Sequence, residues 1–176
     1  MALSRTRLFL PDAVFTGAAA ITPEYLRENG IRALVLDVDN TLTGHGSQEL
    51  PQEIADWLAV MRKAGIAMVI ASNNFEKRVA PFADKIGLPY VSFCCKPSPT
   101  GLARARRKLG VKKEELALVG DQIFTDSVGA NLYGIRMLLV QPMCRDIKWN
   151  IRLKRHLEKP FLKRYYAKGG KLHRTP

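Results

Sequence analysis

Short runs of apolar residues alternate along the chain with longer segments in which apolar residues recur every three or four positions. The runs predict buried strands and the periodic segments predict helices. The five predicted strands cover residues 33–36, 67–71, 90–93, 116–119 and 135–140. Strands that alternate with helices in this way are typical of a parallel sheet with helices on both faces. The sequence therefore predicts an α/β fold of the three-layer, Rossmann-like type, built on five mostly parallel strands.

The C-terminal segment 145–176 carries most of the net positive charge. It holds eleven Lys or Arg residues and two acids, in a chain whose formal net charge is +12. Trp149, Leu153 and Leu157 recur at intervals of four among these cations, which predicts a basic amphipathic helix. We therefore expect a core with an N-terminal arm over 1–144, followed by a basic helix and tail that pack on, or extend from, the same domain.

Chemically reactive residues follow the predicted strands. Asp37 and Asp39 come directly after the first strand, in the segment Asp-Val-Asp-Asn-Thr-Leu at 37–42. In open α/β sheets, ligands bind at the carboxyl ends of the strands. Two carboxylates there need a compensating cation, and their oxygen atoms suit Mg²⁺. An isolated Asp-x-Asp is also compatible with a simple turn cap. Other segments of the chain are needed to choose between a turn cap and a metal site.

Three further segments follow in order, namely Ala-Ser-Asn-Asn at 71–74, Lys96-Pro97, and Gly-Asp-Gln-Ile-Phe-Thr-Asp at 120–126. Each alone would be compatible with a turn or a surface lysine. Together with 37–42 they resemble the four motifs of the haloacid dehalogenase (HAD) superfamily, whose phosphatases act through an aspartyl-phosphate intermediate. The resemblance implies a HAD fold and a Mg²⁺ cofactor, and the short connection after the first motif leaves no space for a large cap domain.

The resemblance also implies a role for each motif residue. Asp37 would be the nucleophile, and Asp39 would protonate the leaving oxygen and then activate water. Lys96 would offset the negative charge of Asp37 and of the transferred phosphoryl group. The expected substrate-binding residues are Asn40, Thr41, Ser72, Asn73 and Lys96, and the expected metal ligands are Asp37, Asp39 (through its backbone carbonyl), Asp121 and Asp126. His45, in the Gly-rich loop after the first motif, is a further candidate for substrate contact.

A narrower resemblance rests on Leu-Pro-Asp at 10–12, Gly30-Ile31, Ser-Asn-Asn, Gly-Asp-Gln and the absence of room for a lid. These features are similar to the YqeG-like HAD phosphatases of subfamily IIIA, which are related to mitochondrial and plastid phosphatidylglycerophosphate phosphatases. The similarity covers about residues 8–158. It implies hydrolysis of phosphatidylglycerophosphate to phosphatidylglycerol in phospholipid biosynthesis. The loop Thr43–Gly46 departs from the subgroup's bulkier or acidic residues, so it does not define substrate contacts.

Composition restricts the partners. The excess of cations predicts attraction to an anionic surface, either a phospholipid leaflet or nucleic acid. The cysteines Cys94, Cys95 and Cys144 form no metal-binding spacing, which favours reduced thiols in the cytoplasm. We expect a cytoplasmic enzyme peripheral to the inner face of the membrane, with a phospholipid headgroup as substrate. Two alternatives stay open, namely a soluble phosphatase of sugar phosphates or nucleotides and an RNA- or ribosome-binding module with vestigial activity. The sequence defines no oligomeric state.

Overall fold

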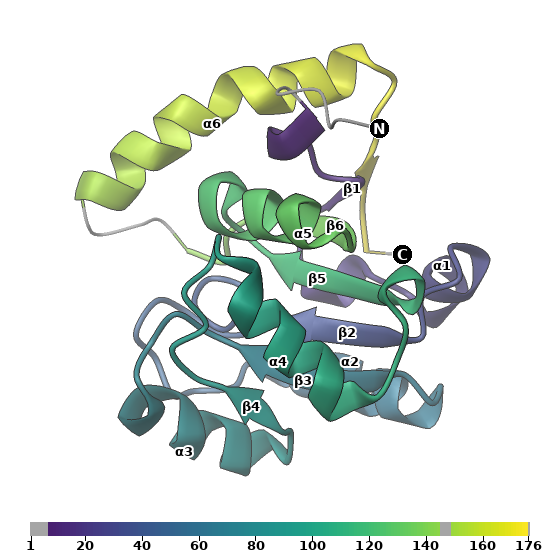
Figure 1. Cartoon of the computed structure of the whole chain (residues 1–176), viewed down its shortest axis with the longest axis vertical. Coiled ribbons are helices and arrows are strands. Elements are labelled where there is room, and N and C mark those ends of the chain that lie inside the picture. Colours follow the sequence, from purple (N-terminus) through teal and green to yellow (C-terminus); the bar gives the residue numbers. More distant parts are fainter. Residues whose placement is uncertain (1–6, 145–148, 176) are drawn as a thin grey trace.

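A parallel sheet of seven strands forms the centre of the molecule in the computed structural model, which describes residues 7–144 and 149–175 (Figure 1). The strand order is β4-β3-β2-β5-β6-β1-β7, and every neighbouring pair is parallel. The strands are β1 (Ala13–Phe15), β2 (Ala33–Leu36), β3 (Ala67–Ala71), β4 (Tyr90–Val91), β5 (Leu116–Gly120), β6 (Arg136–Val140) and β7 (Leu172–His173). The five predicted strands correspond to β2 to β6.

The predicted number of strands was too low. The two missed strands, β1 and β7, lie side by side at one edge of the sheet, where β1 pairs with β6 on one side and with β7 on the other. They contain three and two residues. Segments this short are below the length at which apolar alternation identifies a strand. The predicted N-terminal arm therefore contributes a strand to the sheet, and the predicted tail ends in another.

Helices cover both faces of the sheet, as the sequence predicted. They are α1 (Pro23–Glu28), α2 (Gln52–Lys63), α3 (Glu76–Ile86), α4 (Pro99–Leu109), α5 (Val128–Tyr133) and α6 (Trp149–Ala167). Shorter turns are Arg7–Phe9, Ala18–Ala20 and Lys113–Glu115, and a π-helical turn spans Ile123–Ser127. Local interactions explain why helix α1 begins where it does. Thr22 accepts a hydrogen bond from Tyr25 N, and Pro23 occupies the first turn of α1, where a missing N–H costs nothing.

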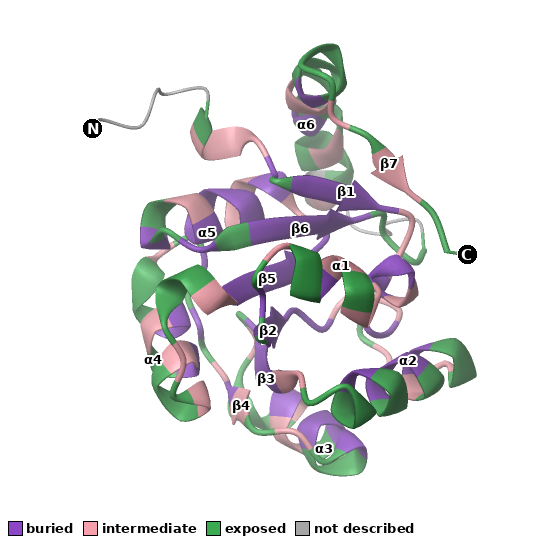
Figure 2. Cartoon of the chain, turned by 90° about the vertical axis from the view of Figure 1, so that its right-hand side faces the viewer, coloured by how far each residue is buried: buried purple, intermediate pink, exposed green. Residues whose placement is uncertain are grey.

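Alternate residues of each strand enter two separate hydrophobic clusters. In β2, Leu34 and Leu36 face α1, α2 and α3, whereas Ala33 and Val35 face α4 and α5. Figure 2 shows these two helical layers on opposite sides of the buried sheet. The period of two along a strand gives each central strand two apolar faces, so the sheet is covered on both sides.

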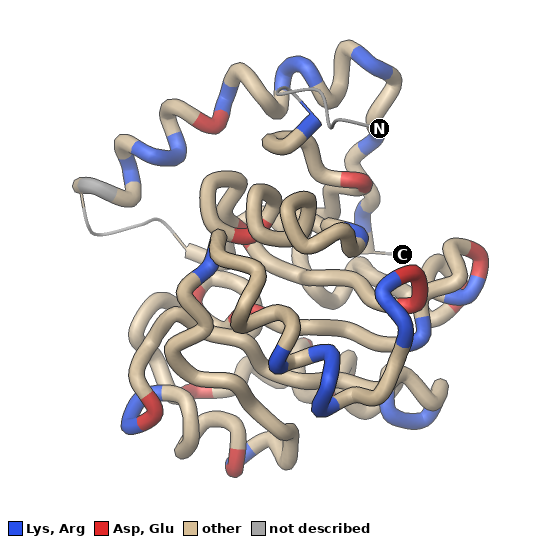
Figure 3. The backbone as a smooth tube through the Cα atoms, viewed as in Figure 1, with Lys and Arg blue, Asp and Glu red and all other residues tan. Residues whose placement is uncertain are grey.

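Helix α6 crosses the edge of the sheet next to β1, and Lys and Arg residues follow much of its length (Figure 3). Its predicted apolar stripe does not pack against the core. The stripe consists of Trp149, Leu153 and Leu157, which are between 51% and 75% exposed. Contacts with the core come instead from its second half, where Phe161 stacks on Phe9 with ring centroids 4.6 Å apart. Leu162 and Tyr165 join the same cluster. Among the described residues, no helix is both long enough and apolar enough to cross a bilayer.

Candidate active site

The carboxyl ends of four strands bring the motif residues to one edge of the sheet. Asp37 follows β2 directly, Ser72 follows β3, and Asp121 follows β5. Lys96 lies in the loop after β4. Because β2 is flanked by β3 on one side and by β5 on the other, Asp37 lies in the middle of this edge. Residues that are far apart in sequence thus converge on Asp37.

Three carboxylates form a compact cluster at this edge. Asp37, Asp121 and Asp126 each offer an oxygen atom, and these atoms lie within 4.8 Å of one another. All three residues are buried. Asp126 approaches the backbone so closely that a Cβ atom on Gly120 would lie 2.5 Å from the Asp126 Cγ atom. The glycine of the Gly-Asp motif is therefore required by packing, since any side chain there would displace Asp126.

Lys96 supplies a buried positive charge to the cluster. Its Nζ atom lies 2.5 Å from Asp37 Oδ1 and 2.7 Å from Asp126 Oδ1. Burial alone lowers the pKa of Lys96, but Asp126 and Asp37 more than offset this effect, so its pKa is raised and the side chain stays charged. Asn73 fixes the backbone of Lys96, since its Nδ2 donates to Lys96 O at 2.9 Å and its Oδ1 accepts from Lys96 N at 2.7 Å.

Burial also perturbs the carboxylates. It raises the pKa of Asp37 to about 6, with Lys96 opposing the shift. Burial likewise raises the pKa of Asp121 well above its usual range, against the opposing effect of Arg155. Acids held in this way have a strong tendency to bind a cation, because a cation relieves both the desolvation and the mutual repulsion.

A divalent metal fits this donor set. Asp121 Oδ1 is buried and accepts no hydrogen bond from any described residue. A buried carboxylate oxygen without a partner is costly unless something outside the chain binds it. Since all the donors of the cluster are carboxylate oxygens, the site suits a hard cation such as Mg²⁺, and Asp37, Asp121 and Asp126 are the residues that could hold it.

The second oxygen of Asp121 contacts α6, which the sequence did not predict. The Arg155 guanidinium donates to Asp121 Oδ2 and to Asp121 O. Glu158, one turn further along the helix, lies 3.3 Å from Arg155 and accepts a hydrogen bond from Ile123 N at 2.7 Å. The helix is thereby fixed to the loop that carries Asp121. A sequence signal does exist, because Glu158 is the sole acid of a helix otherwise rich in Lys and Arg.

Asp39 lies beside the cluster, with its side chain turned to a different set of partners. Asn74 Nδ2 donates to Asp39 Oδ2 at 2.6 Å, Arg78 lies 3.1 Å from Oδ1, and Gly46 N donates to Oδ1 at 2.8 Å. Its side chain is 15% exposed, so it lies at the opening of the site. Arg78 and Asn74 were not predicted, although Asn74 belongs to the second motif. Their contacts orient the Asp39 carboxylate.

The remaining predicted substrate residues lie in the loops that follow β2 and β3. Asn40 is buried in a left-handed conformation with φ of 60°, which asparagine tolerates better than most residues, and its Oδ1 accepts from Cys144 Sγ at 2.9 Å. Thr41 Oγ1 is buried with no hydrogen-bond partner among the described residues. Ser72 Oγ accepts from Asn74 N at 3.2 Å and keeps its own hydroxyl proton to donate. His45 is partly buried in the loop that follows the first motif.

Comparisons with known proteins identify the family and relatives of this chain. Residues 48–134 match the family model for haloacid dehalogenase-like hydrolases, and residues 1–81 match the model for mitochondrial PGP phosphatase. The chain is 33% identical to a probable phosphatase, YqeG, of Bacillus subtilis over 93% of its own length and 95% of that protein. It is 29% identical to the chloroplastic/mitochondrial phosphatidylglycerophosphate phosphatase 1 of Arabidopsis thaliana, over 92% of this chain and 49% of that protein.

Solved structures share the fold at low sequence identity. A haloacid dehalogenase-like hydrolase from Brucella suis gives a TM-score of 0.52 at 11% identity, over 70% of this chain and 93% of that one. The cobalt-bound form of deoxy-D-mannose-octulosonate 8-phosphate phosphatase from Haemophilus influenzae gives a TM-score of 0.51 at 16% identity, over 78% of this chain and 90% of that one. These likenesses confirm the predicted α/β architecture.

Proposed function

The chain belongs to the haloacid dehalogenase-like hydrolases and is a phosphatase of that family, and from this premise we propose that it removes the terminal phosphate of phosphatidylglycerophosphate with Mg²⁺ as cofactor. The observation that supports the chemistry best is the buried cluster in which Lys96 lies between Asp37 and Asp126. Such a cluster combines a carboxylate nucleophile with a fixed positive charge where a phosphoryl group would develop negative charge.

In the proposed first step, a carboxylate oxygen of Asp37 attacks phosphorus, and the bond between phosphorus and the leaving oxygen breaks. The Lys96 ammonium stabilises the charge on the transferred group. Asp39, at the opening of the site, gives a proton to the leaving oxygen. Its contacts with Asn74 and Arg78 hold the carboxyl group in one orientation for this transfer.

In the second step, water attacks phosphorus and the bond between phosphorus and the Asp37 oxygen breaks, which releases inorganic phosphate. Asp39, now deprotonated, takes a proton from that water. Ser72 and the backbone N–H of Asn73 would donate to phosphoryl oxygens, because the Asn73 side chain is already engaged by Lys96. When bound to the carboxylates, Mg²⁺ would supply additional positive charge to the phosphoryl oxygens.

Two features support a lipid substrate. Residues 37–51, which join β2 to α2, are too few to form a cap domain. No cap from this segment therefore blocks the access of a bilayer headgroup to Asp37. The phosphatase from Arabidopsis thaliana to which the chain is similar is described as acting on phosphatidylglycerophosphate. A phosphatase of small soluble esters would instead gain from an enclosed site, which excludes water during the reaction.

Exposed apolar residues support a position at the membrane surface. Phe75 and Phe93 come from the loops after β3 and β4, stack with ring centroids 5.7 Å apart, and are 73% and 57% exposed. Helix α6 adds exposed Trp149 and Leu153 among its cations. Aromatic residues anchor proteins at the lipid interface, and cations near an anionic leaflet contribute about 1 kcal/mol each. Two other aromatic residues of α6, Phe161 and Tyr165, pack against the hydrophobic cluster that contains α4 and α5, so they are not available for this role.

The test is phosphate release from phosphatidylglycerophosphate in mixed micelles, compared with a panel of soluble sugar phosphates and nucleotides. We expect the lipid to have the highest kcat/KM and chelation to abolish turnover, which added Mg²⁺ restores. Asp37→Asn should lower turnover by at least about 10³-fold while thermal stability is retained. Asp56→Asn, which changes an exposed carboxylate on α2, is the matched control and should keep full activity.

Each result addresses a separate part of the proposal. Substantial activity of Asp37→Asn would show that the nucleophile is another group. A soluble ester preferred over the lipid would favour the small-molecule phosphatase. No hydrolysis of any ester, together with salt-sensitive RNA binding, would favour the RNA-binding alternative.

A further inference from the structure

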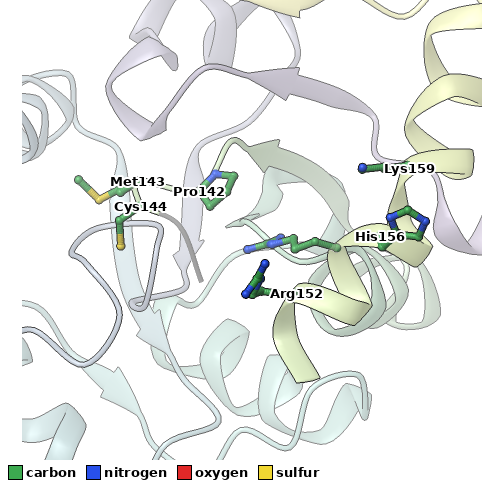
Figure 4. Close-up of a pocket in the computed structure, with 7 residues that line it drawn as sticks. Pro142, Met143, Cys144, Arg152, His156 and Lys159 are labelled. Atoms are coloured by element: carbon green, nitrogen blue, oxygen red, sulfur yellow. The ribbon is translucent and has the colours of Figure 1, made fainter. Parts of the chain in front are cut away.

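A pocket of about 760 Å³ lies between α6 and the segment that follows β6. Pro142, Met143 and Cys144 line one side, and side chains of α6 line the other. Figure 4 shows Arg152 on the side of the pocket formed by α6, with His156 and Lys159 further along the same helix. The volume is within the range of small-molecule binding sites.

The pocket adjoins the carboxylate cluster on two sides. Cys144, in its wall, donates to Asn40 in the loop that follows Asp37. Arg155, which also lines the pocket, donates to Asp121. A ligand whose phosphate lies at Asp37 therefore has its remaining atoms close to this pocket.

The wall formed by α6 is cationic. Arg152, Arg155, His156 and Lys159 are spaced i, i+3, i+4 and i+7, so they share one face of the helix. Glu158 and Asp121 both form ion pairs with Arg155, so the uncompensated positive charge of this face comes from Arg152 and Lys159. In the part of the chain that the structure describes, no carboxylate forms an ion pair with Arg152 or Lys159. Positive side chains gathered in a concave surface concentrate an anionic ligand.

We infer that this pocket binds a second phosphate of the substrate, while the phosphate to be removed lies at Asp37. The inference rests on the proposed function and defines the substrate class as a phosphomonoester with a phosphodiester nearby in the same molecule. Arg152 would bind the phosphodiester through its planar guanidinium and Lys159 as a point charge. Met143 and Pro142 would contact the carbon atoms between the two phosphates.

The test compares two soluble substrates. One is glycerophosphoglycerol phosphate, the deacylated headgroup with a monoester and a diester, and the other is glycerol 3-phosphate, which has the monoester alone. The variant is Arg152→Gln/Lys159→Gln. The matched control is Lys154→Gln/Arg164→Gln, which removes the same two residue types from exposed positions of α6 that do not line the pocket.

We expect the pocket variant to lower kcat/KM for the two-phosphate substrate by about 10- to 100-fold, mainly through KM, and to change glycerol 3-phosphate by less than about twofold. The control should change both substrates by less than about twofold. Equal losses on both substrates, or no loss on either, would overturn the inference. If the lipid fails as a substrate while the two soluble compounds still differ in this way, the proposed lipid function falls and the second phosphate site stands.

Binding provides a readout that does not depend on turnover. With Asp37→Asn protein, calorimetric titration should give a dissociation constant for glycerophosphoglycerol phosphate about 10-fold or more below that for glycerol 3-phosphate. The pocket variant should remove this difference. A pocket variant that still binds glycerophosphoglycerol phosphate about 10-fold more tightly than glycerol 3-phosphate would contradict the assignment.

Discussion

Replacing Lys96 with methionine removes the cation that lies between Asp37 and Asp126. The Nζ atom is 2.5 Å from one carboxylate and 2.7 Å from the other, and all three side chains are buried. Methionine keeps much of the side-chain volume, so the main change is the loss of charge. We expect the free energy of unfolding to fall by about 3–5 kcal/mol, the range for removal of one partner from a buried ion pair. For a chain of this size the melting temperature would fall by about 6–20 °C.

This loss should depend on pH in a defined direction. Burial raises the native-state pKa of Asp37 to about 6 from the ordinary value of 3.8. The native state therefore binds more protons than the unfolded state in this interval, and its stability decreases as pH rises. Without Lys96, whose charge lowers the pKa of Asp37, the carboxylates should bind protons at still higher pH. The stability difference between wild type and Lys96→Met should thus narrow as the pH falls from about 8 to about 5.

Urea unfolding in the presence of a chelator measures this effect, since no divalent cation can then replace the lost charge. Lys108→Met, on the exposed face of α4, is the control and should change stability by less than about 0.5 kcal/mol. Adding Asp126→Asn to Lys96→Met should restore part of the stability, because one uncompensated carboxylate is removed. A loss below about 1 kcal/mol at pH 8, or a loss that is independent of pH, would refute the buried ion-pair geometry.

Three other substitutions or reactions test separate features. Gly120→Ala would put a Cβ atom 2.5 Å from the Asp126 Cγ atom, so it should displace that carboxyl, lower phosphate release and destabilise the protein by about 1–3 kcal/mol in a thermal melt. Burial raises the pKa of the Cys94 thiol to about 11, so iodoacetamide at pH 8 should leave it unmodified by mass spectrometry until the protein unfolds. Trp149→Ser/Leu153→Ser should weaken sedimentation with anionic liposomes several-fold without changing hydrolysis of a soluble ester, because both side chains are exposed.

Controls and contradicting outcomes can be stated for these tests. Gly17→Ala meets no atom within 4 Å of its Cβ position and should behave as wild type. The exposed Cys95 should be alkylated under conditions that spare Cys94. If Trp149→Ser/Leu153→Ser binds liposomes as strongly as wild type does, the proposal that α6 contacts the membrane surface is wrong. Rapid labelling of Cys94, or a Gly120→Ala protein of full activity, would contradict the close packing at the sheet edge.

The strands that hold the site could be predicted because they are long and apolar on both faces. β2, β3 and β5 are each followed directly by a polar residue of a motif, so the pattern and the chemistry agree at the same positions. By contrast, β1 and β7 are recognised as strands only by their pairing with each other and with β6. The hydrogen bonds that define them come from residues distant in the sequence, which no local pattern encodes.

The residues of the active site likewise include some that the sequence could predict and one that it could not. Asp37, Lys96 and Asp121 could be placed at one edge because each follows a predicted strand. Arg155 could not, because nothing local distinguishes it from Arg152 or from the other cations of α6. Its position depends on how the helix docks, which is set by Glu158 and by packing of the second half of the helix.

The position of β1 has a consequence for biosynthesis. Residues 13–15 are translated well before their pairing partners, which are residues 138–140 and 172–173. The nascent chain must therefore carry an unpaired apolar segment until β6 has been translated, and the edge of β6 stays open until that segment docks. Exposed strand edges of this kind promote association between chains, and contacts so distant in sequence form slowly. Demand for chaperones during overproduction is the expected outcome.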